Sequence, residues 1–234
     1  MTHRDLQPEL MDDPSLPQMD HDHALRGLRR INNISRVAQQ LFQQIKRLPN
    51  THSSISILDI ATGSGDTLIA LARMAEDRGC EWQLGGLDIS PTAIRIAADR
   101  ANQKQLDIAW HLADALHDPW PPDSDIVFNA LFLHHLTREQ AVRLLKRMRE
   151  SARHAVIVSD LQRTIPGYLA AKIGTRLLSR SPIVHADGPQ SVRAAWTLAE
   201  LKQLAYEASY EPEATTIRPA WPQRMTLTWV RPGR

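Results

Sequence analysis

The 234-residue sequence predicts an α/β protein with a Rossmann-like, doubly wound sheet. Three observations predict this fold. Short apolar runs alternate with amphipathic segments from Ile55 onward. A glycine-rich turn follows the first apolar run, and an acidic residue lies at or just past the end of each of the first three apolar runs. Such alternation is typical of a parallel sheet that helices cover on both faces.

The strands follow from these apolar runs, and the helices from their start signals. Ser90 before Pro91 predicts one helix start, and Thr137 and Thr197, each followed three residues later by Gln or Glu, predict two capping boxes. One face of the helix after Thr137 is apolar and is expected to pack on the sheet. The expected strands are 55–60, 82–88, 107–112, 125–130 and 154–160, with two late candidates at 213–217 and 225–231.

The first 50 residues divide into two parts. Residues 1–22 mix Pro, Asp and His without periodicity, which predicts a mobile tail or a segment that orders only over a ligand. Residues 23–50 carry apolar side chains at helical spacing, which predicts a helical cap with a break near Asn32 and Asn33. We therefore expect a single domain over residues 23–234.

An insert over residues 161–195 separates the fifth strand from the Thr197 helix. Its aliphatic residues, from Ile165 to Leu178, recur at helical spacing, so we expect a helical lid laid over the carboxyl edge of the sheet. Arg163 and Arg193 are candidates to orient an acidic or hydroxylated substrate. The alternative for these arginines is solvated surface.

Composition narrows the function classes. The formal net charge is +2, which lacks the excess of positive charge that nucleic-acid binding usually needs. A lone cysteine, Cys80, excludes an intramolecular disulfide and a zinc site of paired cysteines, and no metal is expected. No apolar run approaches the length of a membrane span. We expect a cytoplasmic monomer or homodimer with no nucleic-acid or membrane partner.

The glycine turn is the most informative stretch. Gly63 and Gly65 allow the backbone a tight turn and a close approach to a ligand at a helix start. A dinucleotide-binding loop has a third glycine, but Leu68 stands at that position. Asp59 and Asp66 would repel a pyrophosphate. A cationic cofactor without phosphate, S-adenosylmethionine (SAM), therefore suits this turn.

Two more acids follow the next strands. Asp88 ends the second strand, where a carboxylate is expected to accept from ribose hydroxyls. Asp114, just past the third strand, is a candidate partner of the adenine amine, with Ala115 or Leu116 packing on the ring. For Asp88 and Asp114 the alternative is an ordinary helix cap.

The segments D59-I-A-T-G-S-G, L87-D-I-S-P91, A113-D-A-L116 and F128-N-A-L-F-L-H-H-L136 together resemble class I SAM-dependent methyltransferases that act on small molecules. The resemblance covers roughly residues 30–230. It implies seven strands with the last antiparallel, and N-terminal helices that help to cover the substrate. The predicted cofactor contacts are Asp59, Ala61, Thr62, Gly63, Gly65, Asp88, Ile89, Asp114, Ala115 and Asn129. For Asn129 the alternative is satisfaction of local backbone groups.

His134 and His135 follow the fourth strand and are the candidate catalytic residues. A neutral histidine can take the proton of a phenol as methyl transfer proceeds. We favour His135 as the base and His134 as a pocket or structural residue, with a purely structural pair as the alternative. The sequence thus predicts SAM-dependent methylation of a small acceptor, at a hydroxyl of a phenolic, quinol or polyketide-like molecule. A non-catalytic SAM-binding regulator and an NAD-dependent oxidoreductase are the alternatives.

Overall fold

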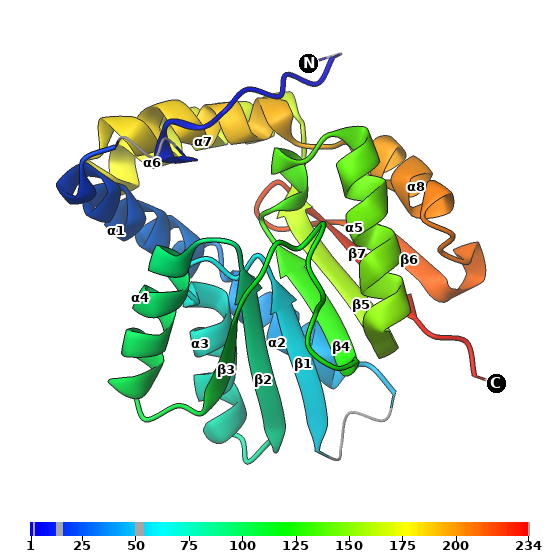
Figure 1. Cartoon of the computed structure of the whole chain (residues 1–234). Helices are drawn as coiled ribbons and strands as arrows, with labels where there is room; N and C mark the ends of the chain where they lie inside the picture. Colours follow the sequence, from blue (N-terminus) through cyan, green and yellow to red (C-terminus); the bar gives the residue numbers. More distant parts are fainter. Residues whose placement is uncertain (2, 13–15, 50–53, 234) are drawn as a thin grey trace.

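The computed structural model describes residues 1, 3–12, 16–49 and 54–233, and its centre is a seven-stranded sheet (Figure 1). The strand order is β3-β2-β1-β4-β5-β7-β6. Only β7 runs antiparallel to its neighbours, β5 and β6. The predicted fold class is confirmed. The strands are β1 (Ile55–Ile60), β2 (Trp82–Asp88), β3 (Ile108–Leu112), β4 (Ser124–Ala130), β5 (Ala152–Leu161), β6 (Thr215–Ala220) and β7 (Arg224–Val230).

The chain reverses its direction of winding at β1. From β1 it moves outward to β2 and β3, then returns to the other side of β1 with β4 and β5. Ligands of open α/β sheets bind beside such a switch point, outside the carboxyl ends of the strands. The turns after β1, β2 and β4 therefore define the place to look for a site.

The predicted strand bounds differ from the structure mainly in the second half. β5 is longer than predicted because it lies between two partners, β4 and β7, whose ladders extend its ends. β6 begins two residues later than predicted, because a short 3-10 helix, η3 (Pro212–Ala214), precedes it. The strands β1 and β2 have the predicted bounds.

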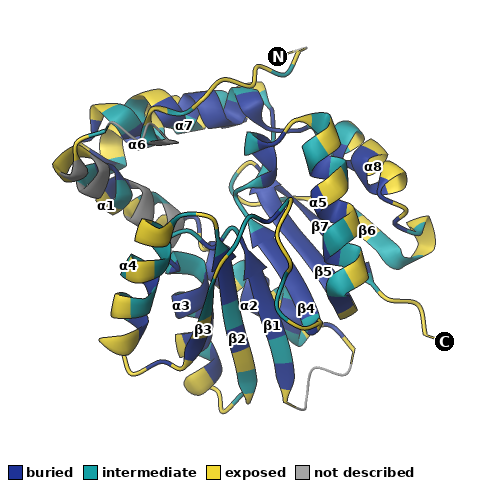
Figure 2. Cartoon of the chain, viewed as in Figure 1, coloured by how far each residue is buried: buried dark blue, intermediate teal, exposed yellow. Residues whose placement is uncertain are grey.

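Helices cover both faces of the sheet, and the strands β1, β4, β5 and β7 are largely buried (Figure 2). On one face lie α2 (Val37–Lys46), α3 (Asp66–Glu76) and α4 (Pro91–Asn102), and on the other α5 (Arg138–Ser151) and α8 (Leu198–Glu207). Ser90 caps α4, and both predicted capping boxes form. The apolar face of α5 is fully buried.

Three further helices lie beyond the carboxyl edge of the sheet: α1 (Gln18–Ile34), α6 (Ile165–Leu178) and α7 (Pro182–Ala194) (Figure 1). The predicted break at Asn32 and Asn33 is wrong. The turn comes at Ser35 and Arg36, where Arg36 has a φ of 53°. The cap helix also begins at Gln18, earlier than residue 23.

The insert 161–195 forms two helices rather than one. Ser179 is extended and Pro182 starts α7, because a proline is favoured in the first turn of a helix and lacks the N–H that a helix interior needs. The aliphatic residues Ile165, Leu169, Ile173 and Leu177, whose spacing predicted the helix, are each at least half exposed.

The N-terminal segment lies along α7 (Figure 1). The Asp187 carboxylate accepts hydrogen bonds from the backbone N–H groups of Leu10 and Met11, which begin the 3-10 helix η1 (Leu10–Asp12), at 2.9 and 3.0 Å. The Gln190 amide donates to the Asp5 carbonyl at 2.9 Å. These contacts place the segment next to the carboxyl edge of the sheet. Its mobility, and its ordering over a ligand, stay predictions.

Among the described residues, no helix has both the length and the apolar character that crossing a bilayer requires.

Candidate functional site

The turn after β1 has the predicted geometry. Ala61, Gly63 and Gly65 all have positive φ, at 57°, 57° and 74°, and α3 begins directly afterwards at Asp66. A Cβ built on Gly63 would meet nothing within 4 Å, so this side of the turn is open to a ligand. A Cβ on Gly65 would lie 2.7 Å from the Trp110 ring, so this glycine serves protein packing instead. Positive φ at Ala61 is a strained conformation of the kind found at ligand sites.

Asp88 joins this turn to the end of β2. Its carboxylate accepts from the Gly63 N–H at 2.8 Å and from the Ser90 N–H at 2.9 Å. The acid therefore stands directly beside the open glycine, as the cofactor prediction requires. It also shapes the start of α4, so the helix-cap alternative describes part of its role.

The other two acids of the turn are less exposed to a ligand than the sequence suggested. Asp66 pairs with Arg100 at 2.5 Å, and Arg100 also donates to the Ser64 carbonyl at 2.6 Å. Asp59 is buried and accepts from the Thr62 hydroxyl at 2.7 Å, and burial raises the pKa of its carboxyl well above the ordinary 3.8. The argument that these two charges repel a pyrophosphate is therefore wrong, and the acidity of the site rests on Asp88.

The adenine side of the predicted site has apolar and polar parts. Ile89 and Leu112, at the ends of β2 and β3, are 65% and 60% exposed, so a flat ring has apolar surface to cover. Ala115 is buried. Asp114 accepts from the Leu116 N–H at 2.7 Å and pairs with His117 at 2.8 Å, which lowers the pKa of Asp114. The cap-like role of Asp114 is thus present, and contact with adenine stays a prediction.

Asn129 connects two strands at the switch point. Its side-chain amide is fully buried and donates to the Ile60 carbonyl at 2.7 Å. Among the described residues its Oδ1 has no hydrogen-bond partner. This geometry matches the alternative in which Asn129 satisfies local backbone, and it leaves one acceptor atom unused.

The histidine pair lies in the 3-10 helix η2 (Leu133–His135) after β4. Asp160, near the end of β5, holds His134 at two points: its carboxylate accepts from the His134 backbone N–H at 3.0 Å, and the His134 Nδ1 lies 2.6 Å from Asp160 Oδ1. The two imidazole rings stack with centroids 4.2 Å apart. His134 is buried and His135 half-buried.

The surroundings give the two histidines opposite acid–base properties. Burial alone would lower the pKa of His134, but the Asp160 carboxylate outweighs it and the net shift is upward. The same pairing lowers the pKa of Asp160 despite its burial. Burial, assisted by the neighbouring His134, lowers the pKa of His135 to about 3. A histidine oriented by a carboxylate is the usual form of a general base, which favours His134 over the predicted His135 for that role.

The N-terminal segment adds a third group to this pair. Glu9 Oε1 lies 3.8 Å from His134 Nε2 and accepts from the Ser191 hydroxyl of α7. Ligand atoms of Glu9, His134 and His135 all lie within 4.8 Å of one another, a set that can hold a divalent cation. The sequence predicted no metal here. His134 can equally receive a proton at Nε2, and a chelator distinguishes a bound metal ion from a proton.

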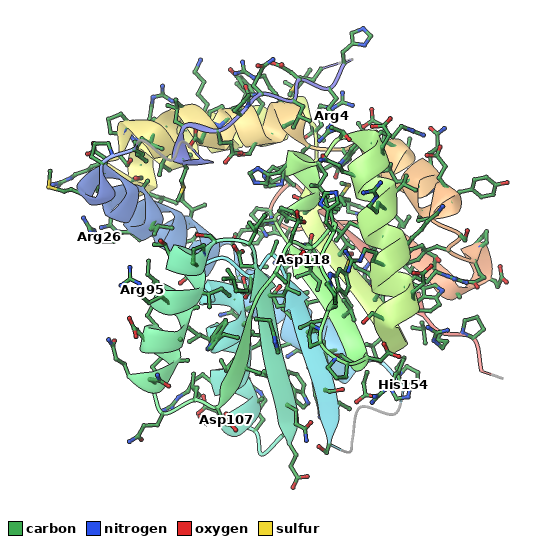
Figure 3. All side chains as sticks on the ribbon, in the orientation of Figure 1. Arg4, Arg26, Arg95, Asp107, Asp118 and His154 are labelled. Carbon is green, nitrogen blue, oxygen red and sulfur yellow. The ribbon has the colours of Figure 1, made fainter. Side chains whose placement is uncertain are left out.

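Arg4 fixes the N-terminal segment over η2 (Figure 3). Its guanidinium lies 3.7 Å from the Trp196 ring centroid and donates to the carbonyls of Ala194 and His134 at 2.5 and 2.7 Å. Trp196 donates in turn to the Leu133 carbonyl at 2.9 Å. These contacts tie the segment, α7 and η2 into one wall beside the histidines.

The two predicted substrate arginines bind groups of the protein itself. Arg163 is buried and donates to the carbonyls of Ala195 and Met1 at 3.0 and 2.9 Å and to the Glu200 carboxylate. Arg193 donates to the Gln190 side chain. These contacts do not support the prediction that the two arginines bind the acceptor, and they give both a structural role. For Arg163, which is buried, the solvated-surface alternative is also wrong.

Sequence reasoning missed Asp160 and Glu9. Asp160 lies at the end of an apolar run, V156-I-V-S-D160, and an acid at the carboxyl end of a central strand was a usable signal. Glu9 had none, because it lies in an unpatterned segment and reaches the site through contacts with α7. A cavity of about 520 Å³ occurs at the opposite edge of the sheet, where His154 lies (Figure 3), and none of the predicted site residues lines it.

Comparison with known proteins agrees with this geometry. Residues 57–155 match the family model described as a methyltransferase domain. Over these residues, which are less than half of the chain, the sequence matches a methyltransferase domain, in agreement with the predicted class I SAM-dependent family. The predicted cofactor, SAM, is the cofactor of this domain. The matched stretch holds the glycine turn, Asp88 and the histidine pair, and ends in β5.

Curated relatives match the methyltransferase domain over a limited segment. A demethylmenaquinone methyltransferase of Deinococcus radiodurans is 37% identical over 73 residues, which cover 31% of this chain and 29% of that relative. A 2-phytyl-1,4-naphthoquinone methyltransferase of Synechococcus elongatus is 39% identical over 69 residues, covering 29% and 28%. The match thus spans less than a third of either relative's length.

Solved structures match the fold of the methyltransferase over almost the whole chain. The plantazolicin methyltransferase BpumL in complex with S-adenosylhomocysteine (SAH) superposes with a TM-score of 0.69 at 16% identity, covering 95% of this chain and 92% of that one. The methyltransferase SibL superposes with a TM-score of 0.68 at 22% identity, covering 100% of this chain and 64% of that one. At these identities the likeness establishes the fold.

Proposed function

We propose that this protein transfers a methyl group from SAM to a small hydroxylated aromatic acceptor, a phenol or quinol, at a ring oxygen. The observation that carries the proposal is the Asp160–His134 pair. Asp160 lies near the end of β5 and His134 follows β4, at the same sheet edge as the open glycine turn. That edge is where ligands of this fold bind.

The residues at the cofactor side fit SAM. Asp88 would accept from the ribose hydroxyls, the open face at Gly63 leaves room for the cofactor backbone, and the exposed Ile89 and Leu112 would cover the adenine. When bound, SAM supplies a methyl group on a positively charged sulfur, which the acceptor displaces in line. A carboxylate at Asp88 suits a cofactor that is positively charged and carries no phosphate.

The acceptor side has one task, the removal of a proton. In the proposal the neutral His134 takes the proton of the ring hydroxyl at Nε2, while Asp160 orients the ring through Nδ1 and stabilises the imidazolium that forms. The 3.8 Å between Nε2 and Glu9 Oε1 exceeds a hydrogen bond, so a hydroxyl placed there would reach both atoms. Arg4 and Trp196 limit access of water to this point.

Carbon is the second candidate for the methylated atom. Several matched relatives are named C-methyltransferases of ubiquinone and menaquinone biosynthesis. Loss of the hydroxyl proton also makes the neighbouring ring carbons nucleophilic, so the same base serves either outcome. We place oxygen first because Glu9 and the lid helices of the acceptor side lie outside residues 57–155, the stretch matched to the methyltransferase-domain model. The matches to these two relatives cover only 34% and 39% of this chain.

The test combines binding and turnover. We expect SAM and SAH to bind in calorimetry and NAD not to bind, and we expect transfer of a ¹³C-methyl group from labelled SAM to a panel of phenols and quinols. Carbon NMR of the product separates a methoxy group from a ring methyl. Binding of SAH without transfer to any acceptor would favour the regulatory alternative, and binding of NAD in place of SAH would exclude the proposal.

A further inference from the structure

Helix α6 exposes its large apolar residues. Ile165, Leu169, Ile173 and Leu177 are 60%, 50%, 59% and 79% exposed. Their spacing of four residues places them on one face of the helix, whereas the buried residues of α6 are the small Gly167 and Thr175. A helix that packs on a core normally does the reverse, so this face calls for an explanation.

Close packing fixes α6 in this orientation. A Cβ on Gly188 of α7 would lie 2.4 Å from the Thr175 side chain, and a Cβ on Gly27 of α1 would lie 2.2 Å from the Ser179 hydroxyl. Only glycine permits these approaches. A rotation of α6 that buried the aliphatic face would lose both contacts, so the fold itself directs that face away from its neighbours in the lid.

Positive charges accompany the aliphatic face. Lys172 and Arg176 are exposed and each directly precedes an aliphatic member of the face, and Arg180 follows the end of the helix. On α1, Arg26 (Figure 3) and Arg30 are exposed, and Arg30 donates to the Leu178 carbonyl at 3.3 Å, which places it at the end of α6. The sequence of α6 contains no acidic residue.

We propose that α6 docks the protein on an anionic lipid bilayer. The docking face consists of Ile165, Leu169, Ile173 and Leu177 with Lys172, Arg176 and Arg180. A short helix with aliphatic side chains on one face and Lys and Arg beside them lies in the interfacial plane, where the apolar groups enter the acyl boundary and the cations meet anionic headgroups. This departs from the sequence expectation of no membrane partner, and it differs from spanning, which no described helix can do.

Charge favours a bilayer over a second copy of the chain. A twofold dimer through this face would bring together two copies of a helix that carries cations and no acidic residue, so neither copy of α6 offers a complementary charge to the other. Like charges brought together in this way oppose association. Anionic headgroups are complementary to the same cations. The inference does not depend on the proposed function, because it concerns binding without cofactor or acceptor.

The test is vesicle co-sedimentation of the full chain. We expect binding to vesicles of phosphatidylcholine with phosphatidylglycerol, and much weaker binding to phosphatidylcholine alone. The triple variant Lys172→Gln, Arg176→Gln, Arg180→Gln should weaken binding by roughly fivefold per cation, since each basic residue near the surface contributes about that factor. A matched control, Arg73→Gln, Arg95→Gln, Lys104→Gln, removes the same charge from exposed positions of α3, α4 and the turn after it and should bind like the wild type.

The aliphatic part has its own variant. Ile173→Ser with Leu177→Ser should lose at least tenfold in binding while the circular dichroism spectrum and thermal midpoint stay unchanged, because both side chains are exposed. Equal binding by the wild type and both α6 variants would overturn the proposal. So would a wild-type dimer in light scattering that the serine variant converts to a monomer, since the face would then be a self-interface.

Discussion

The two sides of this site are encoded differently in the sequence. The cofactor side is local: the glycine turn, Asp88 and Ser90 lie within 30 residues of one another, and the key contact joins Gly63 to Asp88. The acceptor side is assembled from distant segments: Glu9, His134 and Asp160 meet only because the sheet, α7 and the N-terminal segment bring them together. The cofactor side can therefore be recognised from a motif, and the acceptor side only from packing.

The largest expected effect tests the acceptor side. Asp160→Asn should reduce turnover by about 10²–10⁴-fold, the usual contribution of a general base, because the amide no longer orients His134 or stabilises its charged form. SAH affinity should stay within about twofold, since Asp160 lies outside the cofactor turn. Calorimetry measures the SAH affinity, and transfer of the labelled methyl group measures turnover.

The pH profile of turnover distinguishes a catalytic role of His134 from a purely structural one. Wild-type turnover should rise with pH through the pKa of His134, which lies above its ordinary 6.5 because Asp160 outweighs burial. In Asp160→Asn that rise should move to lower pH. Asp125→Asn, an acid at the amino end of β4, is the matched control and should keep both the rate and the profile. An unchanged profile in the Asp160 variant would remove His134 from the role of base.

The sequence predicts each side of the site only as far as the interactions that form it are local in the chain. β1, β2 and the three helix caps were predicted correctly because apolar periodicity and capping residues act within a few positions. Charge pairing is not local: Arg100 neutralises Asp66 from another helix, and burial changes Asp59, so the electrostatic argument from the turn was wrong in its details although the cofactor was right.

The lid shows the same limit more strongly. The periodicity over α6 predicted helical structure correctly, but it did not indicate that the aliphatic face is exposed, as it is in the structure. Gly27 and Gly188, far apart in the sequence, decide which face is buried. No local rule identifies Gly27 as the partner of a helix that begins 138 residues later, at Ile165.

The next effect tests the cofactor side. Asp88→Ala should weaken SAM and SAH binding by roughly 10–10³-fold, because a ligand hydroxyl loses a charged hydrogen-bond partner. Asp88→Asn keeps a hydrogen-bond acceptor, so its affinity for SAM and SAH should lie between those of Asp88→Ala and the wild type. Asp99→Ala removes an exposed acid from the same helix-and-turn region and should bind normally. Wild-type affinity in Asp88→Ala would show that the local motif had been misinterpreted.

A smaller effect concerns stability. A raised folded-state pKa means that the charged His134 stabilises the fold below about pH 6.5, and that this contribution is lost as pH rises through the folded-state pKa. The loss of unfolding free energy caused by His134→Gln should therefore be larger at pH 6 than at pH 9. Urea unfolding at the two pH values measures the difference. A gap independent of pH would mean that folding leaves the pKa of His134 unshifted, and a gap that is larger at pH 9 would mean that folding lowers it.

The smallest expected effect is that of a chelator. If His134 accepts the proton, prolonged dialysis against EDTA should leave turnover unchanged, and added Zn²⁺ should inhibit, because a cation on Glu9, His134 and His135 would occupy the nitrogen that takes the proton. Glu9→Gln should then relieve the inhibition. If EDTA instead abolishes turnover and Zn²⁺ or Mn²⁺ restores it, the cluster is a metal centre, and Asp160 is the carboxylate that orients a metal-bound histidine. Both outcomes involve the same atoms of Glu9 and His134. The chemistry of the acceptor side therefore depends on whether His134 Nε2 binds a proton or a metal ion.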